Sequence, residues 1–480
     1  MPGAYPLYLF SLFENNIRRD YDKVPLIYRR NTQEQISHLE KLELDVKMNE
    51  AFLKVLDTLR PLQGQVLPIR EGAKWLAVYR IRGIPWNLYS SRVADVDSPQ
   101  VLRHKVPDDY FYDHSDALAA LEDDGVPPVT LLLTISNTCN VLGFSFFKPM
   151  FGKEAKATFL AYFNYFMAAD ALPRPRILAF SPPPSRIRTA PANLRIEMTL
   201  EQAHRMYRPS LDPGPFGDVP DVQIGSRILR LSKRKLQQIA ERYAADVPQG
   251  RILGWSLAEI VTVAILWNYI MLDRMVLYRF MPRSSLRTSS RMDLMTSAHE
   301  LIPQREYEGD LMSHLWKGNA EIPIVTTQQG SQFGDAFRDG DACSDAIRES
   351  IVELVASLST ATAAEVRRVA VLKRNLPLQD DLNCYNKALN SCYEGLQAET
   401  WSCLDCNSLD GGSELRYARP VLGVAKSDAA HVGRIRFLPC ENDEEICVYV
   451  SLFQDECRLL RRILIGNEWL TEQGDDLEYF

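Results

Sequence analysis

The chain has 480 residues, of which 46% are hydrophobic, so it can bury large cores and divide into two domains. Its net charge of -7 gives no electrostatic reason to expect nucleic acid as a partner. No charged leader precedes the apolar start, and the most apolar stretch, residues 260–272, is too short to span a bilayer. Nine cysteines spread along the chain fit reduced thiols. We expect a soluble, cytoplasmic protein without a membrane span.

The first part of the chain carries both helical and strand patterns. Apolar residues recur near the helical period over Thr32–Leu59, which predicts an amphipathic helix. Short strands are expected around Val66 and over Trp75–Ile81. The apolar run Val129–Ile135 predicts a buried strand, and Lys153–Ala169 predicts an aromatic-rich helix.

A proline-rich stretch then interrupts these patterns. Ten of the 28 prolines fall within residues 172–221, where they favour extended chain without regular structure. So long a connection is uncommon inside a compact domain and indicates a crossover between two lobes. We therefore expect an N-terminal lobe over 1–171, a crossover over 172–221 and a C-terminal lobe over 222–480.

The second part again mixes strands and helices. Arg227–Leu231 predicts a strand and Lys233–Ala244 a helix. Ser256–Arg274 predicts a mostly buried helix, in which Ser256 and Glu259 form a capping box. The closing elements are expected to be strand, strand and helix around Phe437, Ile446–Leu452 and Asp455–Ile465. Strands and helices in both halves predict an α/β protein.

Four cysteines come close enough together to raise a metal hypothesis. They are Cys384, Cys392, Cys403 and Cys406. Their spacing is not that of a zinc finger, and no histidine stands nearby, so we expect no metal site.

Several short motifs follow one another in a familiar order. Leu59–Gly64 reads LRPLQG, Trp255–Glu259 reads WSLAE and leads into Ala264–Trp267, which reads AILW, and Tyr307–Gly309 reads YEG. Late in the chain, Trp401–Leu404 is followed by Asp410–Gly412. Together they resemble the turn "LxxLPxLAGR", the helix "STxDALxAxxW", the turn "YFGN" and the segment "SWxxLPxYxxDFG" of the BAHD acyltransferases, most closely the fungal trichothecene O-acetyltransferase branch.

The resemblance has definite implications for the fold. It implies the two-lobed architecture shared with chloramphenicol acetyltransferase, in which each lobe is a mixed sheet with flanking helices and a long crossover joins the lobes. It also implies a monomer. Structural roles are implied for the matching residues Tyr307, Gly309, Asp410 and Gly412.

The family's catalytic motif is degenerate in this chain. The family takes the hydroxyl proton with the histidine of HxxxDG, directly after a buried strand. After the strand at Leu131–Thr134, one register places Cys139 at the histidine and Gly143 at the aspartate, and the other places Thr138 and Leu142 there. Neither register holds a base, and losing one costs about 10²–10⁴ in rate. A literal HxxxD at His104 lies in a polar loop, and we interpret it as chance.

The residues around this motif are the candidate site. We predict catalytic roles for Thr138, Cys139 and Asn140, and substrate contacts for Asn137, Leu142, Phe144, Trp401 and Ser402. Each has a structural alternative: a lone buried cysteine is often an inert hydrophobe, and loop asparagines often bond their own backbone. Phe144 suits a core equally well, and Glu259 suits a helix cap better than an acid catalyst.

Three functions remain open at this point. The first is a cyclase or pericyclase, of the intramolecular Diels–Alder type, that shapes a hydrophobic terpenoid or polyketide in the inter-lobe channel and needs no cofactor. The second is an O-acyltransferase with a relocated base, His104 or Cys139, which would use a CoA thioester. The third is a non-catalytic binding protein for small molecules. We favour the first.

Overall fold

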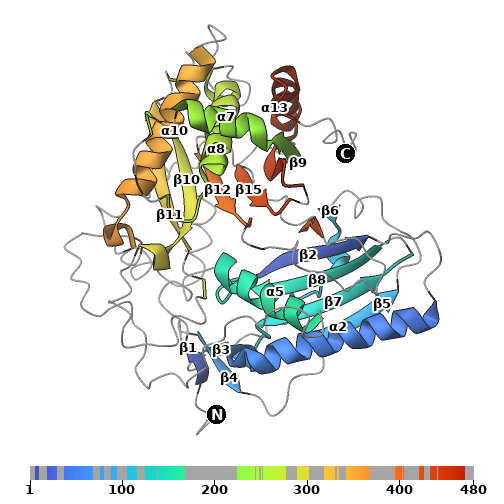
Figure 1. The fold of residues 1–480 in the computed structure, drawn as a ribbon. Coiled ribbons are helices and arrows are strands. Elements are labelled where there is room, and N and C mark those ends of the chain that lie inside the picture. Colours follow the sequence, from blue (N-terminus) through green and yellow to red (C-terminus); the bar gives the residue numbers. More distant parts are fainter. Residues whose placement is uncertain are drawn as a thin grey trace.

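The computed structural model describes residues 6–9, 19–29, 37–68, 76–80, 88–93, 105–115, 125–137, 139–167, 224–243, 245–247, 250, 252–276, 289–301, 318–319, 321–329, 332–333, 342–366, 369, 395–402, 404, 421–425, 433–440 and 442–470. The expected crossover, 172–221, lies outside these residues. Two separate sheets, each with its own helices, build two lobes (Figure 1). The predicted α/β class and two-lobed architecture are confirmed.

A five-stranded sheet in the order β13-β2-β8-β7-β5 forms the N-terminal lobe. Its strands are β2 (Tyr21–Arg29), β5 (Tyr89–Val93), β7 (Val129–Ile135), β8 (Cys139–Phe147) and β13 (Val421–Leu422). Helices α2 (His38–Thr58) and α5 (Lys153–Met167) cover one face (Figure 1). A smaller sheet joins β1 (Pro6–Leu9), β4 (Leu76–Arg80) and β3 (Gly64–Pro68), the last after a 3-10 turn, η1 (Arg60–Gln63).

Local sequence explains these elements. All nine residues of β8 are buried, as its largely apolar sequence favours in a strand packed on both faces. Helix α2 begins with a capping box between Ser37 and Glu40. On α5, Phe159 and Phe163 pack edge-to-face against Phe144 of β8. The predicted strands and helices of this lobe are confirmed wherever the structure describes them.

A six-stranded sheet in the order β11-β10-β12-β15-β16-β9 forms the C-terminal lobe. Its strands are β9 (Ile224–Ser232), β10 (Ser289–Ser297), β11 (Glu321–Gln329), β12 (Gly395–Thr400), β15 (Arg434–Leu438) and β16 (Glu445–Phe453). Its helices are α7 (Lys233–Tyr243), α8 (Leu257–Met271), α10 (Ala342–Thr360) and α13 (Gln454–Gly466), with a π-helical turn, η5 (Leu272–Val276), and a 3-10 turn, η7 (Ala298–Glu300). The predicted capping box of Ser256 and Glu259 is confirmed at the start of α8.

The C-terminal part of the chain also reaches into the N-terminal lobe. β13 pairs with β2 in antiparallel register, and β14 (Val424–Ala425) pairs with β6 (Lys105–Val106), which precedes the 3-10 turn η3 (Asp108–Tyr110). Side chains of Trp401, Leu404 and Leu438 join the hydrophobic core of the N-terminal lobe. The two lobes therefore share packed residues, and their boundary lies where β8 ends and β12 ends.

Candidate functional site

The connection between β8 and α5 lies directly at this boundary. It runs from Lys148 to Gly152, and the Lys148 amide donates to the Asp20 carbonyl oxygen over 2.8 Å. From the other lobe, the Asn319 side-chain amide donates to the Lys148 carbonyl oxygen over 2.7 Å. The Gly152 amide donates to the Gly318 carbonyl oxygen over 3.0 Å. One side-chain and one backbone hydrogen bond thus hold this connection against the C-terminal lobe.

Gly152 has no room for a side chain. A Cβ atom there would lie 2.9 Å from the Gly318 carbonyl oxygen and 3.2 Å from the Asn319 Cα atom, both of them backbone. Any larger residue would push the two lobes apart locally. The close approach of these two backbones therefore requires glycine at this position.

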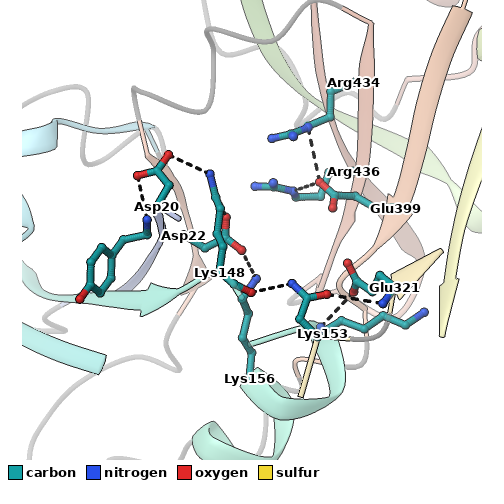
Figure 2. Close-up of polar contacts among 11 residues, drawn as sticks. Asp20, Asp22, Lys148, Lys153, Lys156, Glu321, Glu399, Arg434 and Arg436 are labelled. Atoms are coloured by element: carbon teal, nitrogen blue, oxygen red, sulfur yellow. Dashed lines mark hydrogen bonds and ion pairs between the residues drawn. The ribbon is translucent and has the colours of Figure 1, made fainter. Parts of the chain in front are cut away.

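Carboxylates of β2 and of the residue before it hold two lysines at the boundary. The Lys148 ammonium lies 3.3 Å from Asp20 Oδ2 and 3.6 Å from Asp22 Oδ1. The Lys156 ammonium, on α5, lies 2.5 Å from Asp22 Oδ2. Burial opposes ionisation of Asp22, but the charges of Lys156 and Lys148 outweigh it and hold the pKa of Asp22 well below its usual value. Asp22 is therefore a carboxylate shared by two ammonium groups (Figure 2).

The C-terminal lobe presents a second ion cluster across the boundary. Glu399 of β12 lies 2.6 Å from Arg436 Nε and 3.7 Å from Arg434 Nε, both on β15. Burial raises the pKa of Glu399, but the charges of these arginines outweigh burial, and the pKa lies below its usual value. Figure 2 shows this cluster facing the lysines of the N-terminal lobe. Both sides of the boundary are therefore highly charged although they are largely removed from water.

The Trp401 ring joins the two clusters. The Lys156 ammonium lies 4.6 Å from the ring centroid, and the Arg436 guanidinium carbon lies 3.6 Å from it. A cation on an aromatic face is favourable, more so when it is desolvated. Nearby, Glu321 accepts from the Lys153 amide over 3.0 Å, and its burial raises its pKa despite the Lys156 charge. The boundary thus combines ion pairs, a protonation-prone acid and a buried aromatic ring.

The predicted catalytic residues lie at the opposite end of β8. Cys139 begins the strand, nine residues before Lys148, which is roughly 30 Å along an extended chain. Its side chain packs with Ile27 and Val141, and its Sγ lies 3.6 Å from the Ser136 hydroxyl. Asn137 is exposed in the short connection from β7 to β8. Thr138 lies outside the described residues.

Asn140 is the unusual member of this group. Its side chain is 1% exposed, and among the described residues neither its amide nitrogen nor its amide oxygen has a hydrogen-bond partner. An unpaired buried amide costs free energy, so such groups are rare and call for an explanation. Asn140 points to the helix-covered face of the sheet together with Leu142 and Phe144, which belong to the core of the lobe. Reactive or substrate-binding roles for these residues stay predictions.

The two predicted substrate contacts late in the chain lie elsewhere. Trp401 stands at the charged boundary, as described above. Ser402 lines a cavity of about 740 Å³ in the C-terminal lobe, formed by one side of α7, the start of α8 and the turn between β15 and β16. Its hydroxyl donates to Glu259 Oε1 over 2.9 Å. The predicted site residues therefore fall into separate groups at the far end of β8, in the N-terminal core, at the lobe boundary and at this cavity.

Glu259 itself serves the structure. Ser256 donates to its Oε2 through both the amide and the hydroxyl, over 2.7 and 2.9 Å. Thr400 and Ser402 donate to Oε1 over 2.6 and 2.9 Å. A carboxylate that accepts four hydrogen bonds ties the start of α8 to the end of β12. This agrees with the capping role expected for it.

One imidazole is described near the boundary. His114 stacks on Tyr21 with ring centroids 3.8 Å apart, and its Nε2 lies 3.0 Å from the Thr130 hydroxyl. Burial lowers the pKa of His114 to about 4, so the ring is neutral at pH 7. His104, Tyr307, Gly309, Asp410 and Gly412 lie outside the described residues, so their predicted roles stay predictions.

Sequence reasoning missed the charged boundary. The degenerate HxxxDG motif was predicted after β7, which is a buried strand. β8 is a buried strand as well, and Lys148 follows it directly. Four residues further, at the spacing of the aspartate in HxxxD, stands Gly152, and α5 begins at the next residue. The signal was present in the sequence as a strand, a five-residue connection and a helix.

Comparison with known proteins identifies the class of fold. No protein-family model and no curated protein sequence matches the chain. Similar solved structures include TRI101 of F. graminearum complexed with coenzyme A and deoxynivalenol (TM-score 0.65, 12% identity, covering 97% of this chain and 98% of that one). Vinorine synthase gives a TM-score of 0.57 at 14% identity, covering 98% and 95%. The trichothecene 15-O-acetyltransferase TRI3 of F. sporotrichioides gives 0.56 at 7%, covering 94% and 91%.

These likenesses extend over nearly the full length of both partners. The chain is a two-lobed α/β protein with an acyltransferase-like fold. Its fold is that of the BAHD acyltransferases, as the sequence motifs predicted. Within the described residues, no helix is long and apolar enough to cross a bilayer, and no group of three or more histidine, cysteine, aspartate or glutamate side chains is arranged to hold a metal ion.

Proposed function

We propose that this chain is an enzyme of secondary metabolism that uses the acyltransferase fold without histidine-based proton transfer. It folds a hydrophobic terpenoid or polyketide between its lobes and promotes an intramolecular cyclisation, of the Diels–Alder type. The observation that carries this proposal is Lys148, which stands directly after β8 with its ammonium between two carboxylates. With the HxxxD motif placed directly after β8, Lys148 takes the place of the family's base and Gly152 that of its aspartate.

A lysine held in this way does not perform the family's chemistry. Acyl transfer to an alcohol requires a group that accepts the hydroxyl proton. An ammonium donates three hydrogen bonds and accepts none, and the Lys148 ammonium lies 3.3 Å from Asp20 Oδ2 and 3.6 Å from Asp22 Oδ1. The steric demand at Gly152 also excludes the aspartate that accompanies the histidine. Both halves of the motif are therefore replaced by residues unsuited to a general base.

The same lysine suits a reaction that moves no proton. A cycloaddition exchanges π bonds for σ bonds within one molecule, so substrate and product have the same composition. Holding a flexible chain in its reactive conformation supplies up to about 7–11 kcal/mol of the barrier. A hydrogen bond from the Lys148 ammonium to a substrate carbonyl would withdraw electrons from a conjugated alkene and lower the barrier further. The Lys148 side chain is 23% exposed.

The remaining predicted residues complete this proposal. Trp401 is buried at the boundary against the Lys156 and Arg436 cations, and Ser402 lines the adjoining cavity; both are proposed as substrate contacts. Thr138, Cys139 and Asn140 are proposed to act on a part of the substrate distant from Lys148. We propose a monomer that requires no cofactor.

The cavity gives little electrostatic support to the acyl-CoA alternative. Among the described residues that line it, one lysine, Lys233, faces four carboxylates, those of Glu241, Glu259, Asp443 and Glu445. The phosphates of coenzyme A would meet a predominantly negative wall, which disfavours their binding. A thermal shift with free coenzyme A measures this directly. We expect no stabilisation at millimolar coenzyme A.

Lys148→Met tests the role of the lysine. The variant keeps the length of the side chain but removes the hydrogen-bond donor, and we expect cyclisation to slow by about 10²–10³. Lys54→Met, on the exposed side of α2, is the matched control and should leave the rate unchanged. The assay follows conversion of the linear precursor by liquid chromatography. Equal rates for both variants would remove Lys148 from the mechanism.

A further inference from the structure

Two cysteines lie together at the turn between β15 and β16. Cys447, on β16, pairs in register with Leu438, and Cys440 follows two residues after Leu438. Their sulfur atoms are 2.7 Å apart, only about 0.7 Å longer than an S–S bond. Cys440 is half-buried and lines the 740 Å³ cavity, whereas Cys447 is buried. Both are thiols and are not joined by a disulfide.

The surroundings give the two thiols different reactivities. A hydrogen bond from Cys447 lowers the pKa of Cys440, and the Arg230 guanidinium lowers it further, although burial and the Glu445 carboxylate oppose this. The same hydrogen bond, together with burial, raises the pKa of Cys447 far above its usual value. Arg230 stands opposite Cys447 on β9 and lies 3.3 Å from Glu445. One accessible sulfur is thus suited to attack, and its protected neighbour is suited to resolve the product.

We propose that Cys440 and Cys447 are a redox-active pair that is oxidised reversibly to a disulfide by a small-molecule disulfide such as oxidised glutathione. The Cys440 thiolate attacks one sulfur of the oxidant and expels a glutathione thiolate, which takes up a proton. The Cys447 thiol then loses its proton and attacks the Cys440 sulfur, expelling the second glutathione. Two protein thiols are oxidised, and one glutathione disulfide is reduced to two thiols.

Oxidation changes the wall of the cavity. The turn from Cys440 to Cys447 includes Asn442, Asp443 and Glu445, all of which line it. A disulfide closes this turn into a covalent ring and fixes the positions of these polar side chains. The pair therefore couples the redox state of the surroundings to the shape of the cavity. This inference is independent of the reaction proposed for the lobe boundary.

The folded protein is equilibrated in buffers of graded glutathione redox ratio, quenched with acid, alkylated and mapped by mass spectrometry without reduction. We expect a peptide that links Cys440 to Cys447. Cys440→Ser should abolish it, and Cys447→Ser should stop at one glutathione on Cys440. Cys457→Ser, which removes a buried cysteine of the C-terminal core, is the matched control and should form the link as the wild type does.

A second measurement keeps the proposal testable if a serine variant folds poorly. In the reduced wild-type protein, we expect Cys440 to react with a thiol-specific reagent at least about tenfold faster than Cys457. The absence of the linked peptide across the whole redox range would overturn the proposal. So would equal reactivity of Cys440 and Cys457.

Discussion

Asp22 is the residue on which the charged boundary depends most. It is the carboxylate shared by Lys148 and Lys156, and Lys156 has a side chain only 4% exposed. Asp22→Asn preserves the shape of the side chain but removes its charge, which leaves the Lys156 ammonium buried without that counterion. We expect this single change to destabilise the protein strongly.

The magnitude follows from the burial of the pair. Removing one partner of a buried ion pair costs about 3–5 kcal/mol, because the remaining charge stays desolvated. The side chain of Asp20, which pairs with Lys148, is 32% exposed, and so exposed a pair contributes about 1 kcal/mol or less. Asp20→Asn should therefore cost no more than that. The double variant Asp22→Asn, Lys156→Met should lose less stability than Asp22→Asn alone, because no buried charge is then left over.

Urea-induced unfolding of the four proteins at pH 7 measures these differences. The pKa of Asp22 is lowered in the folded state, so its contribution is present above its unfolded pKa of about 3.9 and is lost as the pH falls from there through the folded pKa. The difference between wild type and Asp22→Asn should therefore shrink below about pH 4. Equal stability losses for Asp20→Asn and Asp22→Asn would refute this reasoning.

Three further predictions concern single residues. Gly152→Ala should cost about 1–3 kcal/mol in unfolding free energy, because its Cβ meets backbone, whereas Gly466→Ala, which meets nothing within 4 Å, should be neutral or slightly stabilising. Burial lowers the pKa of His114 from 6.5 to about 4, so the neutral ring contributes roughly 3 kcal/mol of stability above pH 6.5. This contribution should be lost as the pH falls through about 4. His114→Gln should abolish the loss in a pH series of urea titrations. Asn140→Leu should stabilise by about 1–2 kcal/mol in thermal unfolding, unlike Asn268→Leu, which loses two hydrogen bonds; destabilisation by Asn140→Leu would mean that its amide has a partner.

Sequence patterns predicted the fold well for physical reasons. The helices and strands carry strong periodicity or continuous apolar runs, as in β7, and capping residues such as Ser256 mark a helix start in the sequence itself. The order of short motifs predicted the two-lobed architecture, and the described motifs at Leu59–Gly64 and Trp255–Glu259 lie at a turn and at a helix start.

The site was harder to predict because tertiary contacts create it. Asp22 and Lys156 are far apart in the sequence, as are Trp401 and both of its cations, so no local pattern reveals their contacts. The steric demand at Gly152 comes from Gly318, a residue of the other lobe. The expected histidine motif was therefore predicted after β7 rather than after β8. In the sequence, a lysine directly after β8 resembles an ordinary surface charge.

The central claim is that a paired lysine has replaced the base and that the reaction transfers no acyl group. The most direct test deletes the gene in the organism that encodes this chain and compares the compound that accumulates with the compound that disappears. We predict that the two are isomers of identical mass and that purified protein converts one into the other without coenzyme A. A missing product heavier than the accumulated compound by one acyl group, formed by the protein only with an acyl-CoA, would contradict the account.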